Sequence, residues 1–434
     1  MAVAGMGFCN IGWAEGFIED SHASLSLRNL YFNTDPRSKN SAPRQEEWGQ
    51  AFVLNYQSGF TQGPIGFGVD ALGMLGVRLD GGSKVGKAGA DRTPGVMFPL
   101  ESDGSAVDDF SSLGVTAKAR VSKTELRVGT LQPKLPVVSF SDSRLLPQTY
   151  EGQQITSMEI EGLTFTGGQI EHAKGRTSSD FQALAIGGAA KGADTNHFYY
   201  AGADYKITKD LLGQYYYGNL EDFYNQHFFG LQHAMSIGEG KLKTDLRYFY
   251  NTSDGKNASR QGRAEGYAST GYYTDGATLG EVDNRTWSAM FTYSLGGHAV
   301  SAGYQQLSGD SNFPYINQGS LGATGSGLYL ITDRMIGSFV KAGERTWLAQ
   351  YAYDFAAQGI PGLTASVVYL KGDNIASKRG DLSEWERDTS LGYVVQSGVF
   401  KNVGLTWRSA VFRSDASSDT DQNRLILSYT LPLF

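Results

Sequence analysis

Residues 286–295 read TWSAMFTYSL, and this stretch carries the pattern that decides the fold. Trp287, Phe291 and Tyr293 occupy alternate positions, and serine or threonine fills most of the positions between them. Because successive side chains of a β-strand point to opposite faces, the alternation predicts a strand with one apolar and one polar face.

The same alternation recurs along the whole chain. It appears in 115–121 (VTAKARV) and in 423–434, where leucines alternate with Arg424, Ser428 and Thr430. A soluble β-sandwich explains any single strand of this kind, but it does not explain a whole chain of them with almost no helical pattern between. We predict 18 strands. Their approximate spans are 22–32, 47–58, 65–78, 110–121, 124–131, 153–161, 163–173, 197–206, 210–220, 224–236, 241–250, 285–295, 298–306, 345–355, 362–371, 387–398, 403–413 and 423–434.

The composition supports a closed membrane sheet. The 434 residues include 56 Gly, 24 Tyr and 23 Phe, while only 19% are charged and 40% are hydrophobic. A barrel accounts for the low charge, since about half of each strand faces lipid, where charged side chains are costly. The sequence contains no run of about 18 apolar residues that would form a transmembrane helix.

The connections between the predicted strands alternate in length. Turns such as 121–123, 161–162 and 294–297 are short, whereas 79–109, 132–152, 174–196, 251–284, 307–344 and 372–386 are long. Transmembrane barrels sort their connections in this way, with short turns toward the periplasm and long loops outside. A soluble all-β domain has no reason to do so. The fold class is therefore predicted to be all-β, an 18-stranded antiparallel transmembrane β-barrel in a bacterial outer membrane.

Charge and cysteine content exclude several functions. The net charge of -7 argues against nucleic acid as a partner, and the single Cys rules out a disulfide framework or a cysteine-rich metal site. The six histidines form no HExxH motif, and no GxSxG motif is present. We therefore expect no enzyme activity, no cofactor and no metal. Residues 1–14 are interpreted as a leader or a cloning remnant, and 15–434 as a single barrel domain.

Several stretches resemble the OprD family of substrate-specific outer-membrane porins. They occur in order along nearly the whole chain: EEWGQ (46–50), LRVGTLQPKLPVV (126–138), DSRLLPQTYEG (142–152), LRYFYNTSDGK (246–256) and SEWERD (383–388). ITDRMIGSF (331–339) and SEWERD look most similar to the OpdK-like branch, which favours small carboxylates. The resemblance implies passive, substrate-selective diffusion, with small carboxylates, outer-membrane lipid and lipopolysaccharide as partners and a monomer or weak trimer as the assembly.

The loop following residue 131 is predicted to fold into the lumen. Pro133, Leu135, Pro136, Val137 and Val138 are poor residues for a loop lying in water, and the prolines would stiffen it. A loop packed on the barrel rim is the alternative. The resemblance implies the same inward constriction loop, on which we place Asp142, Ser143, Arg144 and Tyr150.

Arginines offer a path through the pore. Arg28, Arg120 and Arg127 share the polar face of their strands, Arg144 lies on the constriction loop, and Arg408 lies opposite Trp407. The resemblance adds Arg285 and Arg387, although these two share the faces of Trp287 and of Leu391 and Tyr393. Guanidinium groups bind carboxylates through paired hydrogen bonds, so such a row would draw carboxylates along.

Three other interpretations remain open from the sequence. In the first, each arginine forms an ion pair with a lumen-facing Asp or Glu and only stabilises the barrel wall. The same fold can carry basic amino acids, peptides or other zwitterions, with acidic residues capturing the ammonium end. The third is an outer-membrane barrel hydrolase, for which no nucleophile and base are recognisable.

Overall fold

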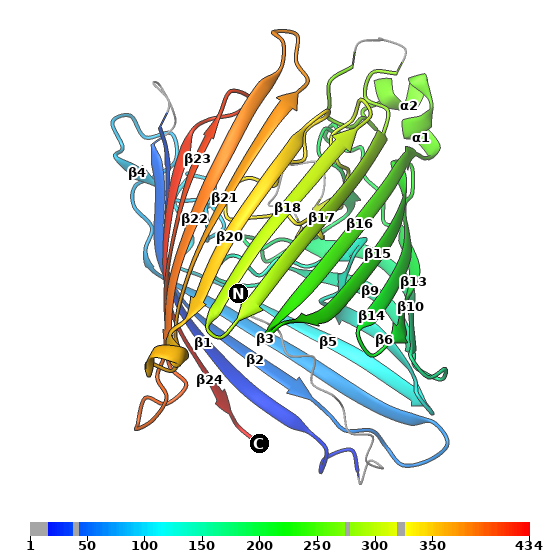
Figure 1. Ribbon diagram of the computed structural model, residues 1–434, viewed down its shortest axis with the longest axis vertical. Helices are drawn as coiled ribbons and strands as arrows, with labels where there is room; N and C mark the ends of the chain where they lie inside the picture. The colour runs from blue at the N-terminus through cyan, green and yellow to red at the C-terminus, as the bar shows by residue number, and fades with distance from the viewer. Residues whose placement is uncertain (1–15, 38–42, 274–277, 319–325) are drawn as a thin grey trace.

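The computed structural model describes residues 16–37, 43–273, 278–318 and 326–434. The predicted leader, residues 1–14, lies outside the described residues. The strands form one antiparallel wall in which β1 (His22–Pro36) also pairs with β24 (Thr420–Pro432), so the sheet closes into an 18-stranded barrel (Figure 1). No helix among the described residues is both long and apolar enough to cross a membrane.

The wall strands between β1 and β24 are, in chain order, β2 (Arg44–Gln57), β3 (Gly66–Asp80), β5 (Asp109–Val121), β6 (Thr124–Leu131), β9 (Thr149–Ser157), β10 (Leu163–Lys174), β13 (Phe198–Thr208), β14 (Leu211–Leu220), β15 (Tyr224–Ile237), β16 (Gly240–Ser253), β17 (Asp283–Leu295), β18 (His298–Ser308), β20 (Arg345–Asp354), β21 (Leu363–Ile375), β22 (Leu382–Val394) and β23 (Gly404–Ser414). Short elements lie in the connections: β4 (Arg92–Thr93), β7 (Lys134–Leu135), β8 (Val138–Ser139), β11 (Phe181–Gln182), β12 (Leu184–Ala185), β19 (Asn317–Gln318), α1 (Gly255–Ala258), α2 (Arg260–Ala264) and η1 (Phe355–Gln358).

Each predicted strand corresponds to one wall strand, so the predicted fold is confirmed. Two predicted spans were displaced along the chain. The predicted strand 153–161 is β9 (Thr149–Ser157), and the predicted strand 387–398 is β22 (Leu382–Val394).

The two faces of the wall differ as the alternation requires. In β17 the side chains of Trp287 and Phe291 are exposed on the outside, while those of Thr286 and Ser288 are buried on the lumen side of the wall. Trp347 on β20 and Trp407 on β23 are likewise exposed. The outward rings form the apolar surface that a barrel presents to lipid.

The connections at the two ends of the barrel differ in length. At one end, turns such as 122–123, 238–239 and 296–297 join strands directly. At the other, called here the long-loop end and drawn at the top of Figure 1, the connections 81–108, 254–282 and 309–344 are long.

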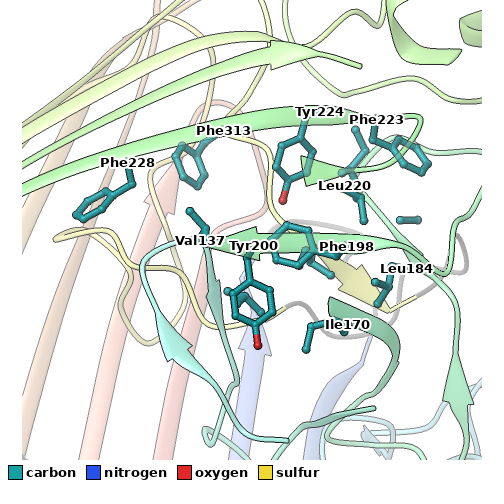
Figure 2. Close-up of a cluster of buried hydrophobic side chains, with 14 of the residues drawn as sticks. Val137, Ile170, Leu184, Phe198, Tyr200, Leu220, Phe223, Tyr224, Phe228 and Phe313 are labelled. Atoms are coloured by element: carbon teal, nitrogen blue, oxygen red, sulfur yellow. The ribbon is translucent and has the colours of Figure 1, made fainter. Parts of the chain in front are cut away.

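Loops from the long-loop end fold inward and pack on the wall in three apolar clusters. The largest joins Val137 and Val138 to aromatic residues of β13 to β16, among them Tyr216, Phe228 and Phe249. Figure 2 shows Val137 lying among rings from these strands. The remaining two clusters lie on β1 to β5 and on β20 to β23. Loop positions are thus fixed by side-chain burial rather than left to solvent.

Candidate functional site: the arginine-lined constriction

The constriction loop, residues 132–148, lies inside the barrel, as predicted. Its first half forms the hairpin β7–β8, and Val137 and Val138 are buried in the first cluster. Its second half buries Leu145 and Leu146 against β1 to β5 in the second cluster. The loop is therefore held from two parts of the wall, with residues 139–144 between the two anchors.

Ser143 on this loop is contacted by three arginines. Arg144 Nη1 donates to the Ser143 carbonyl oxygen at 3.2 Å, and Arg424 Nη1 on β24 donates to the same oxygen at 3.3 Å. Arg176, from the connection after β10, donates to the Ser143 hydroxyl and to Ser141 Oγ, the latter at 2.9 Å. We call Arg144, Arg176 and Arg424 the Ser143 arginine cluster.

The Ser143 arginine cluster is held by neutral oxygens and a ring. Arg144 Nε donates to the Val96 carbonyl at 3.0 Å, and the Arg144 and Arg424 guanidinium groups lie 4.4 and 4.7 Å from the Phe32 ring centre. Among the described residues, no carboxylate forms an ion pair with any of the three. Burial, together with the charges of Arg176 and Arg424, lowers the pKa of Arg144 on the loop well below its usual value. The cluster therefore concentrates three positive charges that have no direct ion pair within the described residues.

Arg28 behaves differently, because it has an acidic partner. Its two terminal nitrogens donate to both carboxylate oxygens of Asp142, at 2.7 and 2.9 Å. Arg28 Nη1 also donates to the Arg144 carbonyl oxygen at 2.8 Å. This pair links β1 to the constriction loop and neutralises one positive charge.

Arg408 adds a further charge beside the cluster. It lies directly opposite Arg424 in the β23–β24 pairing, and its side chain is exposed on the lumen face, opposite Trp407. Like charges placed directly opposite each other on neighbouring strands destabilise a sheet. Such a cost within the lumen points to a functional role.

Toward the short-turn end, the path continues along β5 and β6. Arg127 pairs with Glu125 at 2.5 Å and lines a cavity of about 340 Å³ beneath the constriction loop. Lys118, buried beside this cavity, pairs with Asp70 at 2.6 Å. Arg120 lies farther down, with its guanidinium 4.0 Å from the ring centre of Phe60.

Two arginines assigned to the pore do not line it, so these predictions were wrong. Arg285 shares the outward face of Trp287 and contacts Asp283 at 3.3 Å. Arg387 is exposed on the same face of β22 as Leu391 and Tyr393. The period of two along a strand fixes both side chains on the outside.

Tyr150 also differs from its predicted place. It is the second residue of the wall strand β9 and is fully buried, with its hydroxyl 2.5 Å from Ser326 Oγ. It therefore supports the base of the constriction loop and does not face the solute path. Asp142, Ser143 and Arg144 lie on the loop as predicted.

Sequence reasoning missed two members of the Ser143 arginine cluster. Arg424 carried a usable signal, because it lies on the polar face of the last strand. Arg176 carried none, since it belongs to an irregular connection that meets residue 143 only in the folded chain. Among the described residues, no group of His, Cys, Asp and Glu side chains is arranged to hold a metal ion.

Comparison with protein families gives a match over residues 15–433 to the outer membrane porins of the OprD family. The chain belongs to this family. It is 38% identical to the porin-like protein GalP of Pseudomonas putida, over 97% of this chain and 94% of that protein. It is 59% identical to the crystal structure of Pseudomonas aeruginosa OccK8 (OprE), with a TM-score of 0.88, covering 96% of this chain and 100% of that one. The structure of P. aeruginosa OpdK with vanillate is 35% identical, with a TM-score of 0.82 and the same coverage of each chain.

These relatives confirm the predicted family and the outer-membrane location. They are porins rather than enzymes, which also agrees with the sequence analysis and leaves the barrel hydrolase without support. The protein is an outer-membrane channel for substrate-specific diffusion of small solutes. Its long-loop end faces the outside of the cell and its short turns face the periplasm.

Proposed function

We propose that this porin passes small carboxylate-bearing solutes, such as aromatic or cyclic acids, by passive diffusion along its lumen arginines. The observation that carries the proposal is the Ser143 arginine cluster, three guanidinium groups without a carboxylate partner among the described residues. Arg176 and Arg424 are buried, so they attract a solute carboxylate through their electrostatic field. The exposed Arg408 beside them can offer that carboxylate paired hydrogen bonds.

The affinity of these sites must be low for transport. Two unit charges about 4 Å apart attract by roughly 4 kcal/mol at an effective dielectric of about 20, before the cost of removing water. Conduction needs favourable entry and rapid exit, which several weak sites in series provide. Arg408, which lies opposite Arg424, and Arg127, which lines the cavity beneath the constriction loop, would act as such sites.

Similarity to a solved relative supports the same solute class. OpdK was crystallised with vanillate, a small aromatic carboxylate, and its fold superposes on this chain with a TM-score of 0.82. At 35% identity this likeness supports a carboxylate without selecting one.

The buried acidic residues on the lumen face of β22 do not favour a channel for basic amino acids. Glu386 on β22 is buried and accepts hydrogen bonds from the backbone amides of Ile336 and Gly337, at 2.9 and 2.5 Å. Asp388, on the same face, is also buried. These carboxylates lie under an inward loop, where an ammonium group passing along the lumen does not reach them.

The test is uptake into liposomes that contain the purified protein, with labelled benzoate and labelled arginine measured in parallel. We expect benzoate to enter faster. The variant Arg408→Gln removes a lumen charge that forms no hydrogen bond or ion pair within the described part of the chain, and it should slow benzoate roughly two- to fivefold. Arg387→Gln, on the neighbouring strand but facing outward, is the matched control and should leave the rate unchanged. Faster entry of arginine would overturn the proposed solute class while leaving the channel intact.

A further inference from the structure

The outward face of β20, β21 and β22 carries three basic side chains that the channel does not use. Arg345, Lys371 and Arg387 are each exposed on the face that carries the exposed rings of Trp347 and Tyr369. We call these three residues the basic stripe. None of the three forms an ion pair or hydrogen bond with another residue in the described part of the chain.

The strand register places the basic stripe on neighbouring strands. Lys371 lies opposite both Trp347 and Trp385, which are two residues from Arg345 and Arg387 on their own strands. The three cations are thus diagonal neighbours, with Cα atoms about 7–8 Å apart at each step. An extended anionic group can contact two of them at once.

The tilt of the strands turns this diagonal into a level band. In Figure 1 the strands lean to the right toward the long-loop end, and β22, β21 and β20 follow one another from left to right. A sideways step of about 4.8 Å on strands tilted by about 40° lowers the position by about 3 Å. The accompanying two-residue step raises it by about 5 Å. The stripe therefore rises only about 2 Å per strand and runs nearly parallel to the membrane plane.

Aromatic residues fix the depth of this band. Each cation has a ring two positions away on the same face: Trp347 for Arg345, Tyr369 for Lys371 and Trp385 for Arg387. Outward Trp and Tyr side chains of a barrel lie at the level of the lipid headgroups. The basic stripe thus lies at the headgroup level of the outer leaflet, because β20 begins and β21 ends at the long-loop end.

The absence of internal partners distinguishes the stripe from other basic residues near the same end. Arg37, Arg44 and Arg413 each contact carboxylates of this chain, with distances of 2.8 Å to Asp35, 2.9 Å to Asp91 and 2.7 Å to Asp421, respectively. Within the described residues, the outward face of β20 to β22 carries one acidic residue, Asp373, which lies directly opposite Arg345 without forming an ion pair with it. Three cations thus share the face with one carboxylate, and its net charge is positive. The excess positive charge must therefore be balanced by counter-ions from outside the chain.

We propose that the basic stripe binds the phosphate groups of a phosphorylated outer-leaflet lipid, which in this membrane is lipopolysaccharide. Guanidinium forks match phosphate geometry, and Lys adds a compact charge. This assignment is independent of the solute that the channel carries.

The test measures binding of diphosphorylated lipid A to the purified, detergent-solubilised barrel by native mass spectrometry, with EDTA present to remove bridging divalent cations. The variant carries Arg345→Gln, Lys371→Gln and Arg387→Gln. We expect its affinity to fall on the order of 100-fold, as the loss of three charges near a membrane surface implies. Dephosphorylated lipid A should bind the wild-type barrel as weakly as diphosphorylated lipid A binds this variant.

Two further variants separate charge from folding. The matched control replaces Arg37, Arg44 and Arg413 by Gln and should stay within about threefold of wild type, because those charges are already neutralised by ion pairs. The charge-conserving variant Arg345→Lys, Lys371→Arg and Arg387→Lys should keep most of the affinity. Heat-modifiable gel mobility confirms that each barrel is folded.

Three results would overturn the proposal. They are wild-type affinity in the neutralised variant, an equal loss in the matched control, and full displacement of lipid A by excess inorganic phosphate. The last result would identify a free anion, not a lipid headgroup, as the occupant.

Discussion

Arg408 and Arg387 lie on neighbouring strands and have opposite environments. Arg408 faces the lumen next to other guanidinium groups, whereas Arg387 faces outward beside Trp385. The chain thus places arginine on both sides of one wall, and the two proposals assign a solute carboxylate to the inner side and a lipid phosphate to the outer side. The comparison shows that the face of a strand, rather than a resemblance to a family, decides which environment an arginine enters.

The largest effect should come from the inside of the wall. Replacing Arg144, Arg176 and Arg424 by Gln removes three positive charges at the constriction loop. One-sign charge in a cleft raises the local concentration of counter-ions about tenfold or more. We therefore expect the anion-to-cation permeability ratio, measured from reversal potentials in planar bilayers, to fall by about tenfold or more. A permeability ratio that stays at the wild-type value would contradict the role proposed for the lumen arginines.

A smaller effect of opposite sign should follow when Arg28 loses its partner. Asp142→Asn removes the carboxylate that both Arg28 nitrogens contact. A partly exposed ion pair of this kind contributes up to about 1 kcal/mol, so anion preference should rise up to about fivefold. Glu125→Gln, which frees Arg127 in the same way below the loop, is the companion variant. A fall in anion preference in both would contradict the role given to these arginines.

The neutral oxygens that hold the inner arginines can be tested through Ser143. Ser143→Ala removes the hydroxyl that Arg176 and Arg144 contact but keeps the backbone carbonyl. Losing a hydrogen bond to a charged donor costs about 1–3 kcal/mol. We expect this cost to appear as more frequent current fluctuations of the single channel, since the loop is less firmly held. Ser417→Ala, exposed in the connection 415–419, should leave the current trace unchanged.

The smallest effect should come from the outside of the wall. Arg285→Gln combined with Arg387→Gln should leave the permeability ratio within about 1.5-fold of wild type, because lipid-facing side chains do not set selectivity. The same bilayer measurement checks this. A clear loss of anion preference would show that these side chains reach the lumen.

The sequence was sufficient for the barrel because strand alternation and loop length repeat in every part of the chain. It was less accurate for β22, whose predicted start at 387 lies five residues after the observed start at Leu382. Glu384 and Glu386 face the lumen and bind an inward loop. From the sequence alone, such acidic residues cannot be distinguished from the acidic residues of an exposed loop. The predicted strand positions were least accurate where another part of the chain packs on the polar face of the strand.

The site was predicted only in part, and the errors have a common origin. Alternation placed Arg28, Arg127 and Arg408 correctly, and it also indicated that Arg285 lies on the Trp287 face. The family resemblance pointed to the lumen instead, and for Arg285 the strand period is correct. Neither strand alternation nor the family resemblance indicated Arg176. Its contact with Ser143 joins two irregular segments, and a periodic pattern within one segment carries no information about such a contact.

The pairing that closes the barrel has a consequence for how the chain folds. Ser24 is paired with Pro432, and the Ala23 amide donates to the Phe434 carbonyl at 3.1 Å, so the first and last strands depend on each other. Until that contact forms, the growing sheet has two open edges that can pair with other chains. Contacts between residues so far apart in sequence also form slowly. The interval before β24 meets β1 is therefore when the protein is most exposed to aggregation and to proteases.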